Sequence, residues 1–122
     1  KAHKIKKNNL NEIVLWGNGK AKREAIYVDD IADACIFFMN KKTKSSLINI
    51  GTGKDMSIKQ YANFLIKKLK LKAKIKFDKS KPDGVPKKLL DTTLARKYGW
   101  RAKISLDQGF EITYKSFLEN NK

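Results

Sequence analysis

The run Leu-Ile-Asn-Ile at residues 47–50 constrains the fold of this chain more than any other segment. A continuous apolar run of this length is typical of a strand that is buried on both faces of a parallel sheet. The helix predicted just before it, at residues 29–40, is apolar on nearly every side and therefore requires cover on more than one face. Together these two elements predict an α/β fold whose sheet is larger than this chain of 122 residues supplies.

Strand and helix signals alternate along the rest of the chain, which also favours the α/β class. Two further strands and one short helix are predicted at residues 13–16, 74–78 and 92–98. Two capping boxes predict longer helices, because Ser57 is followed three residues later by Gln60, and Ser105 by Gln108. The last helix is expected to turn a set of apolar side chains inward: Leu106, Phe110, Tyr114, Phe117 and Leu118.

The start of the helix at residues 29–40 follows a pair of carboxylates. Either Asp29 or Asp30 can accept a hydrogen bond from a free backbone N–H there, so either is a candidate N-cap. The single cysteine, Cys35, lies inside the same apolar helix and is expected to be buried as a small hydrophobic residue. With one cysteine and one histidine, His3, the chain is expected to contain no disulfide framework and no metal site, and a reducing cytoplasm is the expected location.

The net charge of +16 raises the hypothesis of a nucleic-acid partner. Arginine accounts for only three of the 28 basic residues, and the planar guanidinium fork is the group that base-edge and phosphate recognition favours. The lysines are spread along the whole chain, so no specific nucleic-acid partner is expected, and a basic polyanion-binding module is kept as an alternative. No apolar run approaches the roughly 20 residues that span a bilayer, so no membrane association is expected.

The glycine turn at residues 51–53 follows the predicted strand and precedes a helix, as a dinucleotide-binding turn would. The third glycine of that fingerprint is missing, because Met56 stands in its position. An ordinary turn is the favoured interpretation, and no cofactor-binding residue is expected in this chain.

Trp16 and Arg23 form the first candidate binding pair. An aromatic ring and a guanidinium seven residues apart suit a base or sugar ring and a diphosphate. Alternatively, Trp16 belongs to the core and Arg23 pairs with Glu24 or Asp29. The spacing alone does not separate these two interpretations.

The second candidate is the segment KPDGVPKKLLD at residues 81–91, which contains both prolines of the chain. Pro82-Asp83-Gly84 predicts a tight turn, because proline fixes φ, aspartate bonds its own backbone and glycine accepts positive φ. A rigid loop with one carboxylate and a pair of lysines suits an anionic ligand rich in hydroxyl groups. The alternative is a solvated surface loop.

Taken together, these segments resemble one enzyme family. WGNGKAKREAIYVDD at residues 16–30 resembles W-G-x-G-x-x-x-R-E-F-x-H-V-D-D of the extended short-chain dehydrogenases/reductases that act on nucleotide sugars. KPDGVPKKLLDTTLARKYGW at residues 81–100 closely resembles K-P-D-G-x-P-R-K-L-L-D-x-x-x-x-x-x-L-G-W of the GDP-L-fucose synthase family. Residues 49–62 and 104–120 resemble the strand–turn–helix and the last helix of the same family.

The resemblance implies an NADP-dependent enzyme that epimerises GDP-4-keto-6-deoxy-mannose at C3 and C5 and then reduces C4. Residues 1–122 would form its C-terminal substrate-binding domain. The helix 29–40 and the strand 47–50 would pack against the N-terminal Rossmann domain of the enzyme. NADP(H) and the catalytic residues would belong to that Rossmann domain, so this chain alone is expected to be inactive. The resemblance further implies a cytoplasmic enzyme of polysaccharide biosynthesis that forms a homodimer.

The resemblance also assigns residues to the GDP-sugar substrate. Five positions match substrate-binding positions of the family: Trp16, Arg23, Asp83, Lys88 and Lys1. Four positions depart from the family pattern: Ala21, Ala25, Tyr27 and Lys87. These departures leave the particular sugar open, and a GDP-heptose or another nucleotide sugar remains an alternative substrate.

Overall fold

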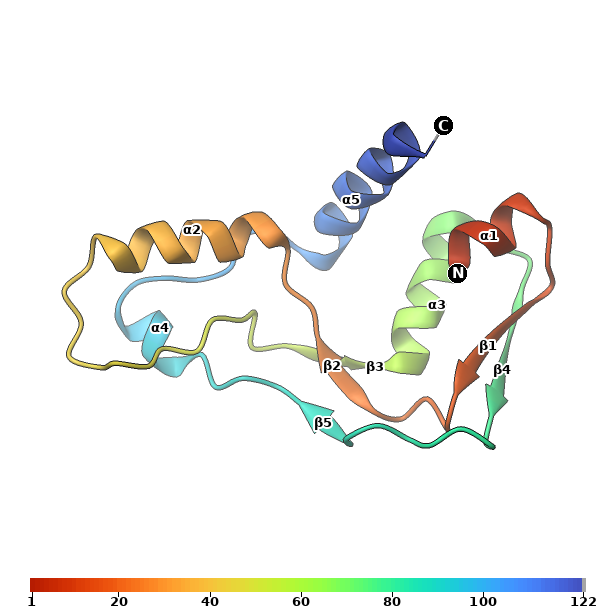
Figure 1. Cartoon of the computed structure of the whole chain (residues 1–122), viewed down its shortest axis with the longest axis horizontal. Coiled ribbons are helices and arrows are strands. Elements are labelled where there is room, and N and C mark those ends of the chain that lie inside the picture. The colour runs from red at the N-terminus through yellow and green to blue at the C-terminus, as the bar shows by residue number, and fades with distance from the viewer. Residues whose placement is uncertain (122) are drawn as a thin grey trace. The chain divides into compact units, whose positions relative to one another are not determined.

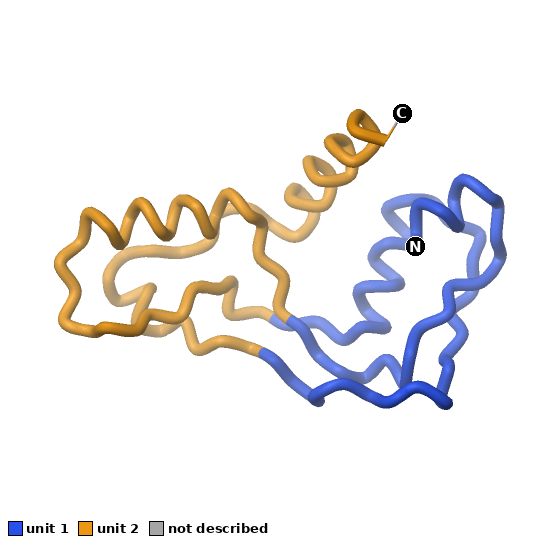
Figure 2. Tube along the Cα trace, viewed as in Figure 1, with its two compact units in different colours: residues 1–23, 55–88 blue, residues 24–54, 89–122 orange. Residues whose placement is uncertain are grey.

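The computed structural model describes residues 1–121, and its helices and strands are interspersed along the chain (Figure 1). In chain order they are α1 (Ala2–Lys7), β1 (Glu12–Trp16), β2 (Lys22–Glu24), α2 (Val28–Met39), β3 (Asp55–Ser57), α3 (Ile58–Leu69), β4 (Lys74–Asp78), β5 (Lys87–Lys88), α4 (Thr93–Lys97) and α5 (Leu106–Asn120). The predicted α/β class is therefore confirmed. The chain divides into two compact units, each built from two segments (Figure 2): unit 1 is residues 1–23 and 55–88, and unit 2 is residues 24–54 and 89–122.

Unit 1 contains the two strands predicted at residues 13–16 and 74–78. β1 and β4 pair in parallel, with Ile13 opposite Ile75 and Trp16 opposite Asp78. Helices α1 and α3 both contact β1, and they also contact each other (Figure 1). The buried apolar side chains of this unit come from all three elements: Ile5, Ile13, Ala62 and Leu69. In β4, Ile75 and Phe77 are partly buried while Lys74 and Lys76 are exposed, as the alternating pattern predicted.

A second sheet has three short strands in the order β3–β2–β5. β2 and β5 pair in parallel, with Lys22 opposite Lys87 and Arg23 opposite Lys88. This pairing joins two segments that lie far apart in the sequence. The predicted ligand residues Arg23 and Lys88 are therefore brought side by side in unit 1.

Both predicted capping boxes are present. The Ser57 hydroxyl accepts from the N–H of Gln60 at 3.1 Å, and the Gln60 side chain accepts from the N–H of Ser57 at 2.7 Å. Ser105 and Gln108 make the same reciprocal pair at the start of α5. Each box satisfies two backbone donors that a helix start otherwise leaves without partners, so these starts are fixed locally.

Unit 2 has its own core, formed by Trp100, Ala34 and Ala95. Helix α2 matches the predicted helix at residues 29–40 to within a residue at each end. The prediction that Asp29 or Asp30 caps it is wrong, since the N-cap is Tyr27. The Asp30 carboxylate is buried and instead accepts from the backbone N–H groups of Lys103 and Ile104, both at 3.0 Å.

The predicted strand at residues 47–50 is not formed. Ile48 and Ile50 pack against the core of unit 2, but Leu47 is 74% exposed. A strand requires a neighbour that pairs with its backbone, and among residues 1–121 no strand pairs with this segment. Asn49 donates its side-chain amide to the carbonyl of Asp91 at 3.3 Å, so the segment is anchored by a side chain.

Two predictions of burial are also wrong. Cys35 is exposed, because α2 turns only its Ala34 side fully into the core, and a neighbour in sequence points about 100° away around the helix. On α5, Phe117 and Leu118 are 41% and 40% exposed, since the apolar stripe extends beyond the part of the helix that packs. The short helix predicted at residues 92–98 is confirmed as α4, and Gly99 follows it with φ of 97°.

Candidate functional site

The five residues assigned to substrate binding all lie in unit 1. Trp16 ends β1, Arg23 lies in β2 and Lys88 ends β5, while Asp83 lies in the loop that leads into β5. Two segments supply these groups, residues 16–23 and 81–88, and they contact each other directly. The Lys1 ammonium donates instead to the carbonyl oxygen of Val14 within β1, a residue outside both segments.

Trp16 is the most exposed of the large aromatic groups in this region. Its side chain is 66% exposed, so the alternative that it belongs to the core is wrong. The Lys81 ammonium lies 5.9 Å from the centre of its ring, within the range of a cation–π contact. An exposed indole beside an ammonium is suited to a ligand with a flat ring and an anionic group.

Asp83 is held by the turn that follows β1. One carboxylate oxygen accepts from the backbone N–H of Asn18 at 2.7 Å, and the other accepts from the side-chain amide of Asn18 at 2.6 Å. Asn18 in turn accepts from the backbone N–H of Lys20 at 2.8 Å. Gly17, with φ of 67°, permits this approach, because a Cβ there would lie 2.0 Å from the Asp83 carboxylate. The carboxylate is therefore fixed in direction while remaining on an exposed residue.

Arg23 also contacts the 81–86 loop, through its guanidinium. Nη1 donates to the carbonyl oxygens of Lys22 at 2.6 Å and Val85 at 2.8 Å. Gly84 leaves room for the other terminal nitrogen, since a Cβ there would lie 2.8 Å from Nη2. The donors of Nη1 are thus committed to backbone carbonyls, which orients the rest of the planar fork.

Lys87 and Lys88 form β5. Lys88 is exposed and lies opposite Arg23 in the sheet. The Lys87 ammonium lies 3.8 Å from the carboxylate of Asp55, and the Lys22 ammonium lies 3.9 Å from it on the neighbouring strand. Asp55 therefore forms ion pairs with lysines of the other two strands, and Lys88 and Arg23 are the basic groups of this sheet that remain candidates for an anionic ligand.

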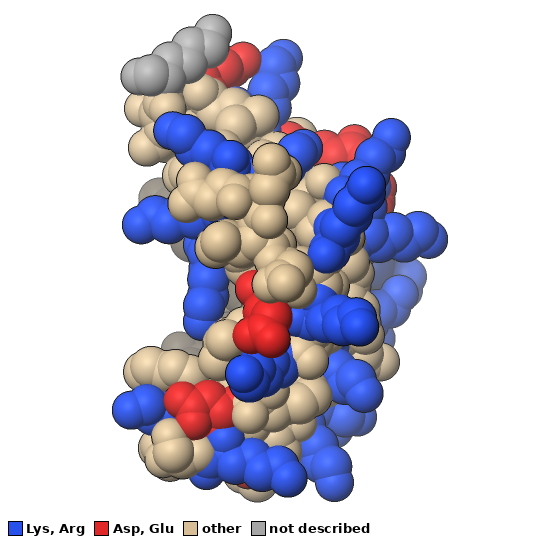
Figure 3. Space-filling view, turned by 90° about the vertical axis from the view of Figure 1, so that its right-hand side faces the viewer, with Lys and Arg blue, Asp and Glu red and all other residues tan. Residues whose placement is uncertain are grey.

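Basic side chains are spread over the face seen in Figure 3, with a few acidic groups between them. This distribution agrees with the net charge of +16. A surface of this kind attracts any polyanion, and the attraction is screened by salt. Charge alone therefore does not single out one ligand, whereas the fixed carboxylate of Asp83 adds a group that a simple polyanion does not use.

In unit 2, the glycine turn at residues 51–53 is bound by a carboxylate of the chain itself. Glu24 accepts from the N–H of Gly53 at 2.6 Å and from the hydroxyl of Thr52 at 3.0 Å. Its other oxygen accepts from the N–H of Leu90 at 3.2 Å. The turn N–H that a bound phosphate would need is therefore already used, in agreement with the interpretation as an ordinary turn.

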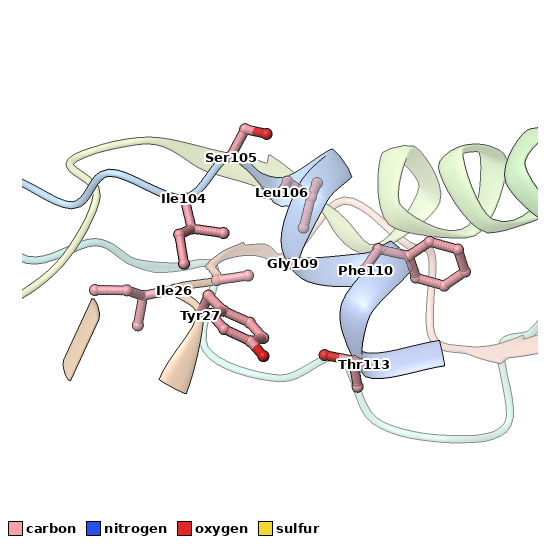
Figure 4. A pocket seen from close by; sticks show the side chains of 9 residues that line it. Ile26, Tyr27, Ile104, Ser105, Leu106, Gly109, Phe110 and Thr113 are labelled. Atoms are coloured by element: carbon pink, nitrogen blue, oxygen red, sulfur yellow. The ribbon is translucent and has the colours of Figure 1, made fainter. Parts of the chain in front are cut away.

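Unit 2 also contains an open pocket of about 210 Å³ between the segment before α2 and the start of α5 (Figure 4). Its lining is mostly apolar and comes from Ala25, Ile26, Tyr27, Ile104, Ser105, Leu106, Gly109, Phe110 and Thr113. Tyr27 packs against α5 at Gly109, where an added Cβ would lie 3.1 Å from the ring. None of the predicted ligand residues lines this pocket.

Sequence reasoning missed Asn18, Lys81 and Glu24 as functional or supporting groups. Asn18 was detectable, because an asparagine between two glycines is a residue type that bonds nearby backbone and tolerates turns. The partner of Asn18 was not detectable, since Asp83 is 65 residues away. Among residues 1–121, no group of three or more His, Cys, Asp and Glu is arranged to hold a metal ion. Within that part of the chain, no helix has the length and apolar character needed to cross a membrane.

Known proteins share much of this sequence and fold. Residues 1–51 match the model of the NAD dependent epimerase/dehydratase family. The chain is 42% identical over 118 residues to a putative GDP-L-fucose synthase 2 of Arabidopsis thaliana, a match that covers 97% of this chain and 36% of the relative. It is 41% identical over 127 residues to a GDP-L-fucose synthase of Escherichia coli K12, covering 97% and 40%.

A solved structure agrees with these matches. The fold is similar to that of a GDP-mannoheptose C4 reductase from Campylobacter jejuni with NADP bound, with a TM-score of 0.78 and 30% identity over 96% of this chain and 41% of that one. The fold is thus similar to part of an extended short-chain dehydrogenase/reductase, and residues 1–51 match the NAD dependent epimerase/dehydratase family. The chain is similar to the GDP-L-fucose synthases, and it spans about two fifths of their length.

Proposed function

We propose that this chain is the GDP-sugar-binding portion of an NADPH-dependent epimerase/reductase that converts GDP-4-keto-6-deoxy-mannose or a related GDP-keto-sugar. The observation that carries the proposal is the contact between residues 16–23 and 81–88. That contact gathers an exposed indole, a guanidinium and a fixed carboxylate in one unit. The similarity to GDP-L-fucose synthases supports the choice of a GDP-sugar.

Each proposed group has a chemical task. Trp16 offers a flat apolar face to the ring of a base or sugar. Arg23 and Lys88 offer positive charge to the diphosphate, and the planar guanidinium can donate two parallel hydrogen bonds to it. Asp83, as a carboxylate, accepts hydrogen bonds from hydroxyl groups and is repelled by phosphate. We further propose that Lys1 contributes positive charge at the edge of the same site.

We also propose that residues 1–122 act as a substrate-binding domain beside a separate domain that holds NADP(H) and supplies the catalytic residues. The exposed apolar side chains of α2 support this arrangement, because Ile36 is 64% and Met39 is 84% exposed. Apolar exposure on this scale favours burial against another surface. In this proposal the whole enzyme is a cytoplasmic homodimer of polysaccharide biosynthesis, and this chain alone catalyses no reaction.

A GDP-heptose is the second candidate substrate. The similarity to the Campylobacter jejuni GDP-mannoheptose C4 reductase favours it. The departures from the family pattern at Ala25 and Tyr27 also leave room for a different sugar. A turnover screen of the intact protein with NADPH against GDP-keto-hexoses and GDP-keto-heptoses distinguishes the two.

The binding proposal is tested by Arg23→Ala in the intact protein. We expect the affinity for GDP-L-fucose to fall by at least about tenfold, because the hydrogen bonds of a guanidinium to a charged group are lost. NADPH affinity should stay unchanged, since the proposal assigns the cofactor to other residues. Isothermal titration with both ligands measures this, and Arg101→Ala, an exposed arginine of unit 2, is the matched control.

Unchanged GDP-L-fucose affinity in the Arg23→Ala protein would contradict the assignment of Arg23. The alternative of a polyanion-binding module predicts a different pattern. In that case both arginine variants should weaken RNA binding equally, and RNA should still bind tightly at about 150 mM salt.

A further inference from the structure

Asn18 makes three hydrogen bonds although it is an exposed turn residue. Its backbone N–H and its side-chain amide each donate to a different oxygen of Asp83, at 2.7 Å and 2.6 Å. Its side-chain oxygen accepts from the N–H of Lys20 at 2.8 Å. Both ends of the Asn18 side chain are thus engaged, so the amide cannot rotate without breaking one of these bonds.

The two hydrogen bonds from Asn18 determine which acceptor positions of the Asp83 carboxylate remain available to a ligand. An ionised carboxylate has about four acceptor positions on its two oxygens, and Asn18 occupies one position on each oxygen. The remaining positions can accept two donors that approach together. A charge-assisted hydrogen bond is about twice as strong as a neutral one. Because Asn18 already holds the carboxylate in place, its binding to hydroxyl donors costs little further loss of side-chain freedom.

The same contacts fix the loop that carries Asp83. Residues 81–86 are held at Asp83 by Asn18 and at Val85 by Arg23, and both holding residues come from the segment that follows β1. At Gly17 a Cβ would clash with Asp83, and at Gly84 a Cβ would force the Arg23 guanidinium to shift. Asn18 therefore controls the direction of Asp83, while Arg23 holds the other side of the loop. The tight turn predicted at Pro82-Asp83-Gly84 is not formed, since these residues lie in an irregular loop and Gly84 does not adopt positive φ.

From this geometry we propose that Asn18 is a positioning residue that holds the Asp83 carboxylate toward hydroxyl groups of the bound nucleotide sugar. The proposal rests on the proposed function, because it assumes that a nucleotide sugar binds at residues 16–23 and 81–88. Asn18 acts through Asp83, and the ligand group it serves is a sugar or ribose hydroxyl rather than the diphosphate.

The first test is Asn18→Asp, which preserves the size and shape of the side chain. The new carboxylate still accepts from the Lys20 N–H, but it replaces the donor to Asp83 with a like charge. We expect GDP-L-fucose affinity of the intact protein to fall by more than about tenfold, and Asn18→Ala, which only removes the donor, should lose about tenfold. Asn11→Ala makes the same truncation at an exposed asparagine elsewhere in unit 1 and should change affinity by less than about twofold.

The second test exchanges the two partners in the double variant Asn18→Asp with Asp83→Asn. In that variant the amide at position 83 can accept from the backbone N–H of residue 18 and donate to the carboxylate at position 18, so the contact between the segments is rebuilt. We expect the melting temperature to return to that of the unaltered protein while GDP-L-fucose affinity stays low. This separation distinguishes a positioning role from a merely structural one, because only the former requires the charge at residue 83.

Two results would overturn this proposal alone: unaltered affinity in Asn18→Asp, or full recovery of affinity in the exchanged protein. If the unaltered protein and Asn11→Ala both fail to bind GDP-L-fucose, the proposed function itself is overturned and this inference with it. Titration calorimetry and a thermal melt on the unaltered protein and all of these variants separate the outcomes.

Discussion

The two tryptophans of the chain occupy opposite environments, one in each unit. Trp100 in unit 2 is 2% exposed, and its indole N–H donates to Asp33 at 2.9 Å. Trp16 in unit 1 is 66% exposed and lies beside the ammonium of Lys81. A buried tryptophan contributes to stability through the apolar area it removes from water, whereas an exposed one leaves that area available to a ligand. The comparison therefore separates a unit with an aromatic core from a unit that presents an aromatic surface.

The polar contacts of the two units differ in the same sense. In unit 2, the carboxylates of Asp30 and Glu24 accept from backbone N–H groups and hold loops together inside the unit. In unit 1, the carboxylate of Asp83 is held by Asn18 on exposed residues. A carboxylate that is fixed but exposed, such as that of Asp83, is available to bind a ligand. The carboxylates of Asp30 and Glu24 already accept hydrogen bonds from the backbone of unit 2.

The largest expected difference between the units is in stability. Trp100→Ala should lower the free energy of unfolding by about 3–5 kcal/mol, because it opens a cavity in the core of unit 2. Trp16→Ala should change it by about 0.5 kcal/mol or less, as surface substitutions do. Urea denaturation followed by far-UV circular dichroism measures both. Equal losses from the two substitutions would contradict the claim that Trp100 belongs to a core and Trp16 to a surface.

A smaller effect on stability is expected from pH, through the carboxylate of Asp33 in unit 2. The hydrogen bond from the Trp100 indole, followed by that from the Lys103 ammonium, holds the pKa of Asp33 below its usual range. Because the pKa of Asp33 is lower in the folded state than in the unfolded state, its ionised form stabilises the fold above the unfolded pKa of about 4. This stability is lost as the pH falls through the pKa of the folded state.

Asp33→Asn removes the titrating group and retains its shape, so it isolates this contribution. The unaltered protein should lose more stability than the variant between about pH 4 and pH 2. Thermal melts of both proteins across that range measure the difference, and Glu119→Gln, at an exposed glutamate near the end of α5, serves as the control. Parallel acid curves for Asp33→Asn and the unaltered protein would contradict a role for this carboxylate.

Local signals in the sequence predicted local structure well. The capping boxes at Ser57 and Ser105 predicted two helix starts, because both partners of each box lie within one turn of the chain. The alternation at residues 74–78 predicted β4, since one side of a strand pair faces solvent. These features depend on neighbouring residues, so no knowledge of distant contacts was needed.

Predictions that depended on distant partners were less complete. The strand expected at residues 47–50 requires a pairing neighbour, and the burial expected for Cys35 requires a surface that covers its side of α2. The apolar residues before Trp16 in the sequence did not predict that its side chain is exposed. The contact between Asn18 and Asp83 joins residues far apart in the sequence, so only the folded chain reveals which group orients the carboxylate.

The central claim is that the surface presented by unit 1 binds a GDP-sugar, and amide hydrogen exchange tests it most directly. When GDP-L-fucose is added to the intact protein, exchange should slow at residues 16–23 and 81–88, where the candidate ligand groups lie. The core of unit 2 around Trp100 should exchange at the same rate with and without ligand. Slowed exchange confined to unit 2, or unchanged exchange in both segments of unit 1 at saturating ligand, would contradict the claim.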